Sequence, residues 1–150
     1  MFEPTHVLVP LVGRSREAAA IEYALETFPE AELTVLAVST PLDSAMSEGG
    51  VLERDDERRT EARNRARSLL EVSTEALERA GSDVQGDVDA AIDVEEGRPG
   101  AVVPRYVSDS DVDHVVMCGS DSSGLVRRLL GRDVSTTVVE RTDVPVTVLE

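Results

Sequence analysis

Five short apolar segments alternate with segments of helical periodicity, and no other feature of the sequence constrains the fold as strongly. Strict alternation of this kind is typical of parallel strands joined by helices that cover both faces of a sheet, with right-handed crossovers. The sequence therefore predicts a doubly wound α/β fold with a five-stranded parallel sheet. A chain of 150 residues is long enough for a full core, and we expect one domain over residues 1–150. The apolar segments cover residues 5–12, 33–38, 87–93, 113–118 and 145–149.

Four helical segments are predicted between these strands, and the last of them follows the turn at Gly119. Apolar residues at spacings of three and four run from Ala18 to Phe28, with Ser15 as the expected N-cap and Pro29 as the stop. A longer pattern covers 51–80 and begins with an almost wholly charged stretch, which favours a solvated helix face over a nucleic-acid surface. A short helix is expected over 100–108, kinked or frayed by an internal proline.

The charge and the residue usage exclude several classes of function. The formal net charge is −15, from 30 acidic and 15 basic residues, and every basic residue is Arg. Such a surface repels nucleic acid and anionic lipid. No apolar run is long enough to span a membrane, and the first residues are too polar for a signal peptide. The acid excess and the absence of Lys resemble proteins of salt-in halophiles; the alternative is a specific basic partner.

Reactive residues are few and are not arranged for catalysis. Cys118 lies in an apolar run and is expected to be a buried small hydrophobe, which fits a reducing cytoplasm. His6 and His114 each flank a strand start, without other ligands at metal-binding spacing. The acids of segment 87–93 alternate on one side of a half-exposed strand, which favours an edge strand over a cation site. The sequence therefore predicts no catalytic residue and no metal site.

The stretch from Val115 to Leu149 reads as strand, glycine-rich turn, helix and strand. The turn begins at Gly119, directly after a buried strand and before a helical segment. Backbone amides at such a turn suit a phosphate group. The alternative is that its glycines serve only turn geometry and packing.

Several segments, taken in order and spacing, resemble the universal stress protein family over essentially the whole chain. The resemblance implies the strand order 3-2-1-4-5 of the adenine nucleotide alpha hydrolase-like fold, with the first and fourth strands adjacent. It also implies homodimers, often paired through the last strand, which makes Val144, Val146 and Val148 candidate dimer residues. Some members of the family bind ATP or AMP, and others bind no nucleotide. The segments that carry the resemblance are residues 7–15, 31–38, 96–99, 113–120 and 143–149.

The chain departs from the ATP-binding members of that family at most positions of their motif. Val12 stands where those members carry an aspartate, and Ser122 stands where they carry a second glycine after Gly119. Depending on the alignment, Gly131 or Arg132 occupies the position of the third glycine. The candidate nucleotide-binding residues implied by the resemblance are Pro10, Val12, Val38, Gly119, Ser120, Ser122, Gly131, Arg132 and Ser135.

Two hypotheses about function remain open. The first is a non-enzymatic stress or regulatory module, a cytoplasmic homodimer that acts on an unknown protein partner, with weak or no nucleotide binding and no cofactor. The second is a sensor of the same family that binds ATP or AMP with Mg²⁺ through the Gly119 turn, Arg132 and Ser135.

Overall fold

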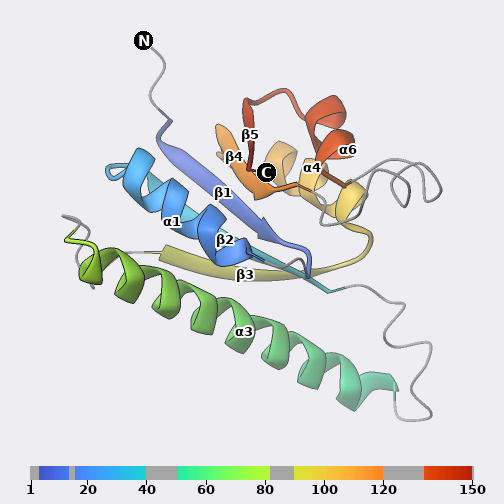
Figure 1. Cartoon of the computed structure of the whole chain (residues 1–150). Coiled ribbons are helices and arrows are strands. Elements are labelled where there is room, and N and C mark those ends of the chain that lie inside the picture. The colour runs from blue at the N-terminus through green and yellow to red at the C-terminus, as the bar shows by residue number, and fades with distance from the viewer. Residues whose placement is uncertain (1–3, 14–15, 40–50, 82–89, 120–133, 150) are drawn as a thin grey trace, which may run out of the picture.

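A five-stranded parallel sheet forms the centre of the molecule (Figure 1). The computed structural model describes residues 4–13, 16–39, 51–81, 90–119 and 134–149, with the backbone alone for 51–56. The strand order is β3-β2-β1-β4-β5, and every neighbouring pair is parallel, so the predicted order and the predicted adjacency of the first and fourth strands are confirmed. The strands are β1 (His6–Leu11), β2 (Glu32–Ser39), β3 (Ala90–Glu96), β4 (His114–Cys118) and β5 (Val146–Leu149).

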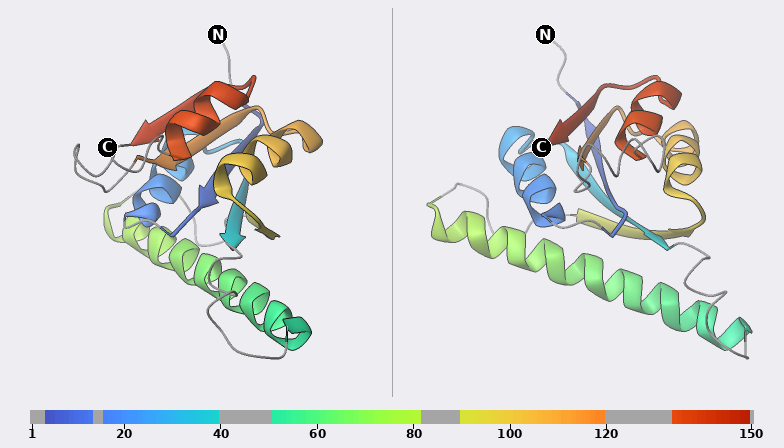
Figure 2. Two further views of the ribbon diagram at one scale, coloured as in Figure 1. Left: turned by 90° about the vertical axis from the view of Figure 1, so that its right-hand side faces the viewer. Right: turned by 45° about the vertical axis from the view of Figure 1, so that its right-hand side comes forward.

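Helices cover both faces of the sheet. Helices α1 (Glu17–Thr27) and α3 (Val51–Arg79) lie on one face, and α4 (Pro99–Asp109) and α6 (Val134–Arg141) lie on the other (Figures 1 and 2). In the part of the chain that the structure describes, no helix is long and apolar enough to cross a membrane.

The core is divided by the sheet into two layers, and β1 contributes to both. Val7, Val9 and Leu11 pack under α1 and α3, whereas Leu8 packs on the side of α4 and α6. All four side chains are buried, as the continuous apolar run predicts for a central strand. The core is built mainly from Val, Leu, Ile and Ala because the chain has few aromatic residues.

One predicted boundary and one predicted helix feature need correction. Strand β3 continues to Glu96, three residues beyond its predicted end, because its pairing with β2 extends to Ser39. Residues 87–89 and the expected N-cap Ser15 lie outside the described residues. Helix α4 runs through Pro104 to Asp109 without a break in the helix.

Helix α3 is much longer than the strands beneath it. Its 29 residues correspond to about 43 Å, whereas the eight residues of β2 correspond to about 26 Å. The helix therefore extends past the ends of the strands (Figures 1 and 2).

Candidate functional site

The first and fourth strands separate towards their carboxyl ends, and this is where an open α/β sheet binds ligands. β1 pairs with β2 over six residue pairs, but with β4 only at Val7–His114 and Leu8–Val115. The order of the strands also reverses at this point, since β1 lies between β2 and β4. We call the space beyond the carboxyl ends of β1 and β4 the switch-point crevice.

Pro10 gives a physical reason for the separation. The Thr5 carbonyl accepts a hydrogen bond from the Glu32 N–H on the β2 side, and the His6 carbonyl accepts one from the Asp113 N–H on the β4 side. Even-numbered residues of β1 therefore direct their backbone groups towards β4. Pro10 has no N–H to donate in that direction. The ladder between β1 and β4 therefore ends at Leu8, and the next available N–H on that side belongs to Val12.

The carboxylate of Glu17 accepts that N–H. Its Oε2 lies 2.6 Å from the Val12 nitrogen, and its Oε1 lies 3.1 Å from Nη2 of Arg65 on α3. The side chain of Glu17 is 3% exposed, whereas that of Arg65 is 52% exposed. The ion pair therefore joins the first turn of α1, the end of β1 and the middle of α3. Glu17 comes to this point because it opens α1, five residues after the strand-end N–H that it accepts.

The turn between β1 and α1 is held close to α3 and β4. Gly13 has φ +90°, and a Cβ at this position would lie 4.0 Å from Nη1 of Arg65. Arg16, which precedes α1, has φ +62°, and the thiol of Cys118 donates to its carbonyl at 3.0 Å. The expectation that Cys118 is buried is confirmed, since it is 8% exposed.

The structure brings several of the candidate nucleotide-binding residues to the same edge of the sheet. Val12, Val38 and Gly119 are half-buried at the carboxyl ends of β1, β2 and β4, and Pro10 is buried in β1. Ser135 is buried in the first turn of α6. Ser120, Ser122, Gly131 and Arg132 lie outside the described residues.

Gly119 itself is committed to the sheet. Its N–H donates to the carbonyl of Leu149 at 2.7 Å, which extends the pairing of β4 with β5. This N–H is therefore engaged in holding the last strand.

Sequence reasoning did not find Glu17 or Arg65. Arg65 follows the charged stretch of the long helical segment and is separated from Glu17 by 48 residues, so no local pattern connects the two. A signal for Glu17 did exist in the sequence, because an acidic residue in the first turn of a helix lies near the end of the preceding strand when the connection is short.

The two histidines couple neighbouring strands at the opposite end of the sheet. Nε2 of His6 lies 2.7 Å from Oγ1 of Thr34, and Nε2 of His114 lies 2.9 Å from Oγ1 of Thr147. Burial lowers the pKa of His114, and the charge of Asp113 partly opposes that shift. No group of three or more metal-ligating side chains is present among the described residues.

Asp113 joins the beginnings of β1 and β4. Its carboxylate accepts hydrogen bonds from both Thr5 N and Thr5 Oγ1 at 2.9 Å and from His6 N at 3.1 Å. Burial acts to raise the pKa of Asp113, but these hydrogen bonds outweigh it and the pKa is lowered. The carboxylate therefore has a structural role.

Comparisons with known proteins agree with this fold. A sequence model of the universal stress protein family matches residues 4–150. Among solved structures, the chain is similar to UspA from Lactobacillus plantarum, with 17% identity, 100% of each chain covered and a TM-score of 0.63. A comparison with curated proteins gave no match.

Two similar structures contain a nucleotide. One is a universal stress protein in complex with cAMP, with 18% identity, 99% of this chain and 98% of that chain covered, and a TM-score of 0.62. The other is a universal stress protein family protein from Arabidopsis thaliana with AMP bound, with 19% identity, 97% and 91% covered, and a TM-score of 0.57. At such identities the likeness shows the fold, and the predicted adenine nucleotide alpha hydrolase-like fold is confirmed.

Proposed function

Because the chain belongs to the universal stress protein family, we propose that it is a non-enzymatic stress or regulatory module with weak or no nucleotide binding. Residues 1–150 act in this proposal as one domain that functions through contacts with a protein partner. A cytoplasmic location fits the single free cysteine, Cys118.

The observation that carries this proposal is the buried carboxylate of Glu17 at the switch-point crevice. The Val12 N–H and the guanidinium of Arg65 are groups that bind an anion, and Glu17 already bonds to both. A phosphate group that approached the end of β1 would meet a negative charge that is 3% exposed. Repulsion between like charges is strong where water is excluded. In this proposal the Glu17 carboxylate occupies the donors that a phosphate group would otherwise use.

We further propose that the module is a homodimer that pairs through β5. Among the described strands, β5 is an edge of the sheet with a neighbour on one side, and such an edge favours pairing with another chain. Val146 and Val148, together with the preceding Val144, are half-buried and pack only partly on the core. A second copy would cover both the edge and these valines.

A second candidate function is a sensor that binds ATP or AMP with Mg²⁺. It is favoured by the position of Gly119 at the crevice, by the buried Ser135 at the start of α6, and by the similar structures that contain cAMP or AMP. In this alternative, Arg132 and Ser135 would bind the phosphates.

A thermal-shift titration separates the two candidates. We expect the Tm to stay constant when ATP or AMP is added, with and without Mg²⁺, in concentrated KCl. A ligand present at 100 times its Kd would add about 2.7 kcal/mol to the free energy of unfolding and raise the Tm by several degrees. Such a rise in the unmodified chain would favour the sensor.

A Glu17→Ala variant tests the reason for the expected result. If the carboxylate keeps nucleotide out, AMP should stabilise this variant more than the unmodified chain. A variant that is folded and equally unresponsive would remove Glu17 from the explanation. Sedimentation equilibrium tests the dimer separately: a monomer that persists in concentrated KCl, where repulsion is screened, would contradict pairing through β5.

A further inference from the structure

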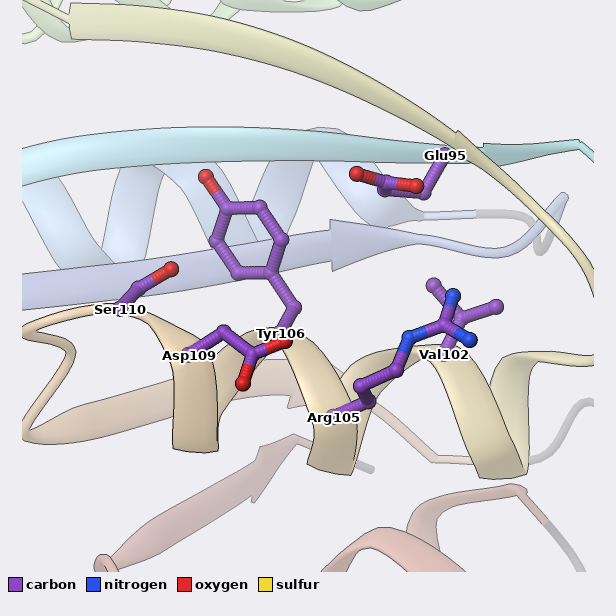
Figure 3. A pocket seen from close by; sticks show the side chains of 6 residues that line it. All are labelled: Glu95, Val102, Arg105, Tyr106, Asp109 and Ser110. Atoms are coloured by element: carbon purple, nitrogen blue, oxygen red, sulfur yellow. The ribbon is translucent and has the colours of Figure 1, made fainter.

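A second concave site lies between β3 and α4. This hollow has a volume of about 140 Å³ and is lined by Glu95, Val102, Arg105, Tyr106, Asp109 and Ser110 (Figure 3). It is separate from the switch-point crevice, because β2 lies between β3 and β1 in the sheet. The hollow opens to solvent, since Arg105 and Asp109 in its lining are exposed, so a longer ligand can occupy it with one end outside.

Tyr106 gives the hollow a fixed aromatic wall. Its hydroxyl donates to Oδ2 of Asp93 at 3.1 Å, which fixes the direction of the ring. Burial raises the pKa of Tyr106, and the hydrogen bond to Asp93 and the charges of Asp93 and Glu95 raise it further, so the phenol is neutral at physiological pH. Val102, which also lines the hollow, belongs to the core and is 2% exposed. The hydrogen bond to Asp93 therefore holds the aromatic wall, and a core residue forms another part of the lining.

Charged side chains from two elements surround this wall. Glu95 projects from β3 towards the side of the hollow where Arg105 projects from α4, and Asp109 lies one helical turn after Arg105 (Figure 3). Within the described part of the chain, none of these three side chains forms an ion pair, whereas Arg59, Arg65 and Arg79 do. The hollow thus presents one guanidinium and two carboxylates that form no direct ion pair with any described residue.

We propose that the hollow binds a free basic α-amino acid. The ligand carboxylate would pair with the guanidinium of Arg105, which matches a carboxylate in a two-pronged geometry. The two cationic groups of the ligand would pair with Glu95 and Asp109, next to the face of the Tyr106 ring, where a cation is also attracted. The carboxylates of Glu95 and Asp109, and that of Asp93 next to Tyr106, outnumber the one guanidinium, so the hollow is negative and favours a positively charged ligand over a neutral amino acid. This site goes beyond the proposed function, because it provides a small-molecule input to a regulatory module.

Calorimetric titration with L-lysine tests the site. We expect saturable binding at ligand concentrations up to about 10 mM, which detects a Kd of about 1 mM. We also expect clearly weaker binding of 1,5-diaminopentane, which lacks the carboxylate, and of 6-aminohexanoate, which lacks the α-ammonium group. Amide shifts in NMR spectra should be concentrated between Glu95 and Ser110. No heat with L-lysine, or equal binding of 1,5-diaminopentane, would overturn the proposal.

Matched variants connect the binding to named side chains. Arg105→Ala and Glu95→Gln should each weaken L-lysine binding by at least about tenfold, the loss expected for a charge-assisted hydrogen bond. The controls Arg67→Ala and Glu26→Gln remove exposed charges from α3 and α1 and should leave the Kd unchanged. If both pairs of variants bind L-lysine as the unmodified chain does, the ligand binds elsewhere and the assignment is wrong.

Discussion

The carboxylate of Glu17 connects the end of β1 to Arg65 on α3 and so holds the β1–α1 turn in place. The carboxylate has donors on two elements, while its own side chain is 3% exposed. Removing one partner of a buried ion pair leaves the other groups without compensation. The pair therefore predicts a large effect for a single substitution at this turn.

Glu17→Ala should lower the free energy of unfolding by about 2–3 kcal/mol, because the Val12 N–H and Arg65 both lose their acceptor. Urea denaturation followed by far-UV circular dichroism measures this change, since the chain has no Trp. The matched control is Glu26→Ala, which removes an exposed carboxylate from the same helix and should change the stability by less than about 0.5 kcal/mol. Equal effects of the two substitutions would mean that the buried pair contributes nothing.

Substituting two glycines by alanine distinguishes the cost of backbone strain from the cost of steric overlap. Gly81 has φ +78° and nothing within 4 Å of the place where a Cβ would lie, so Gly81→Ala should cost about 1 kcal/mol from strain alone. Gly97 has φ +141°, and a Cβ there would lie 2.7 Å from Cγ2 of Val102, so Gly97→Ala should cost about 2–4 kcal/mol. Chemical denaturation of the two variants checks the order, and a larger loss for Gly81→Ala would contradict it.

His114 makes the stability depend on pH in a defined direction. Its pKa in the folded state is lowered by burial, and its buried Nδ1 has no hydrogen-bond partner among the residues that the structure describes. The unfolded chain, in which the pKa is about 6.5, therefore takes up a proton more readily. The stability contributed by the neutral imidazole is present above about pH 6.5 and decreases as the pH falls below that value. In His114→Gln, which does not titrate, this part of the pH dependence between about pH 7.5 and 5.5 should disappear; an unchanged slope would assign it to other groups.

At the scale of the elements, the side chains of Arg63 and Asp93 bond to backbone groups on the outer edge of β3. The N–H of Gly97 donates to Ser39 on β2, so odd-numbered residues of this strand face β2 and even-numbered residues face outward. On the outer side, Nη1 of Arg63 donates to the Ile92 carbonyl at 3.2 Å, and the Val94 N–H donates to Oδ1 of Asp93 at 2.9 Å. These contacts block the addition of another strand, as protected edges do.

Arg63→Ala should therefore increase association through β3. We expect species larger than those of the unmodified chain in size-exclusion chromatography with light scattering, because the Ile92 carbonyl becomes available to a strand of another copy. Arg67→Ala, an exposed arginine on the same helix, is the control and should leave the size distribution unchanged. If both variants behave alike, the arginine does not protect the edge.

The sequence predicts the elements well because their signals are local. The apolar runs of β1 and β2, the periodicity of α1 and the glycine after α3 each depend on residues within one segment. The predicted end of β3 is three residues too early because an alternating, half-exposed strand has no sharp apolar boundary. Pro104 was expected to disturb α4, but packing of Val102, Val103 and Val107 on the core retains the helix around it.

The candidate site was predictable only in its position. The resemblance indicated that Val12, Val38 and Gly119 meet at one edge of the sheet, and they do lie at that edge. The contact between Glu17 and Arg65 depends on how α3 crosses the β1–α1 turn, which no local pattern encodes. The charges beside Tyr106 likewise come from separate elements, β3 and α4.

At the scale of the whole molecule, the net charge of −15 opposes the compact state. The Debye length falls from about 10 Å at 0.1 M salt to about 3 Å at 1 M, so salt should screen this repulsion. We expect the Tm to rise between about 0.05 and 1 M KCl. A variant with several exposed glutamates changed to Gln, for example Glu26, Glu30 and Glu71, should show a smaller rise. A Tm that is independent of KCl would mean that the repulsion is negligible.

The length of α3 has a mechanical consequence. A helix is far stiffer than a loop, so the part of α3 that extends past the strands acts as a lever whose fulcrum is its packing on α1, β2 and β3. Arg65 lies on this lever and holds the buried carboxylate at the end of β1. We expect a force applied to the protruding end to reach the β1–α1 turn through the Arg65–Glu17 contact.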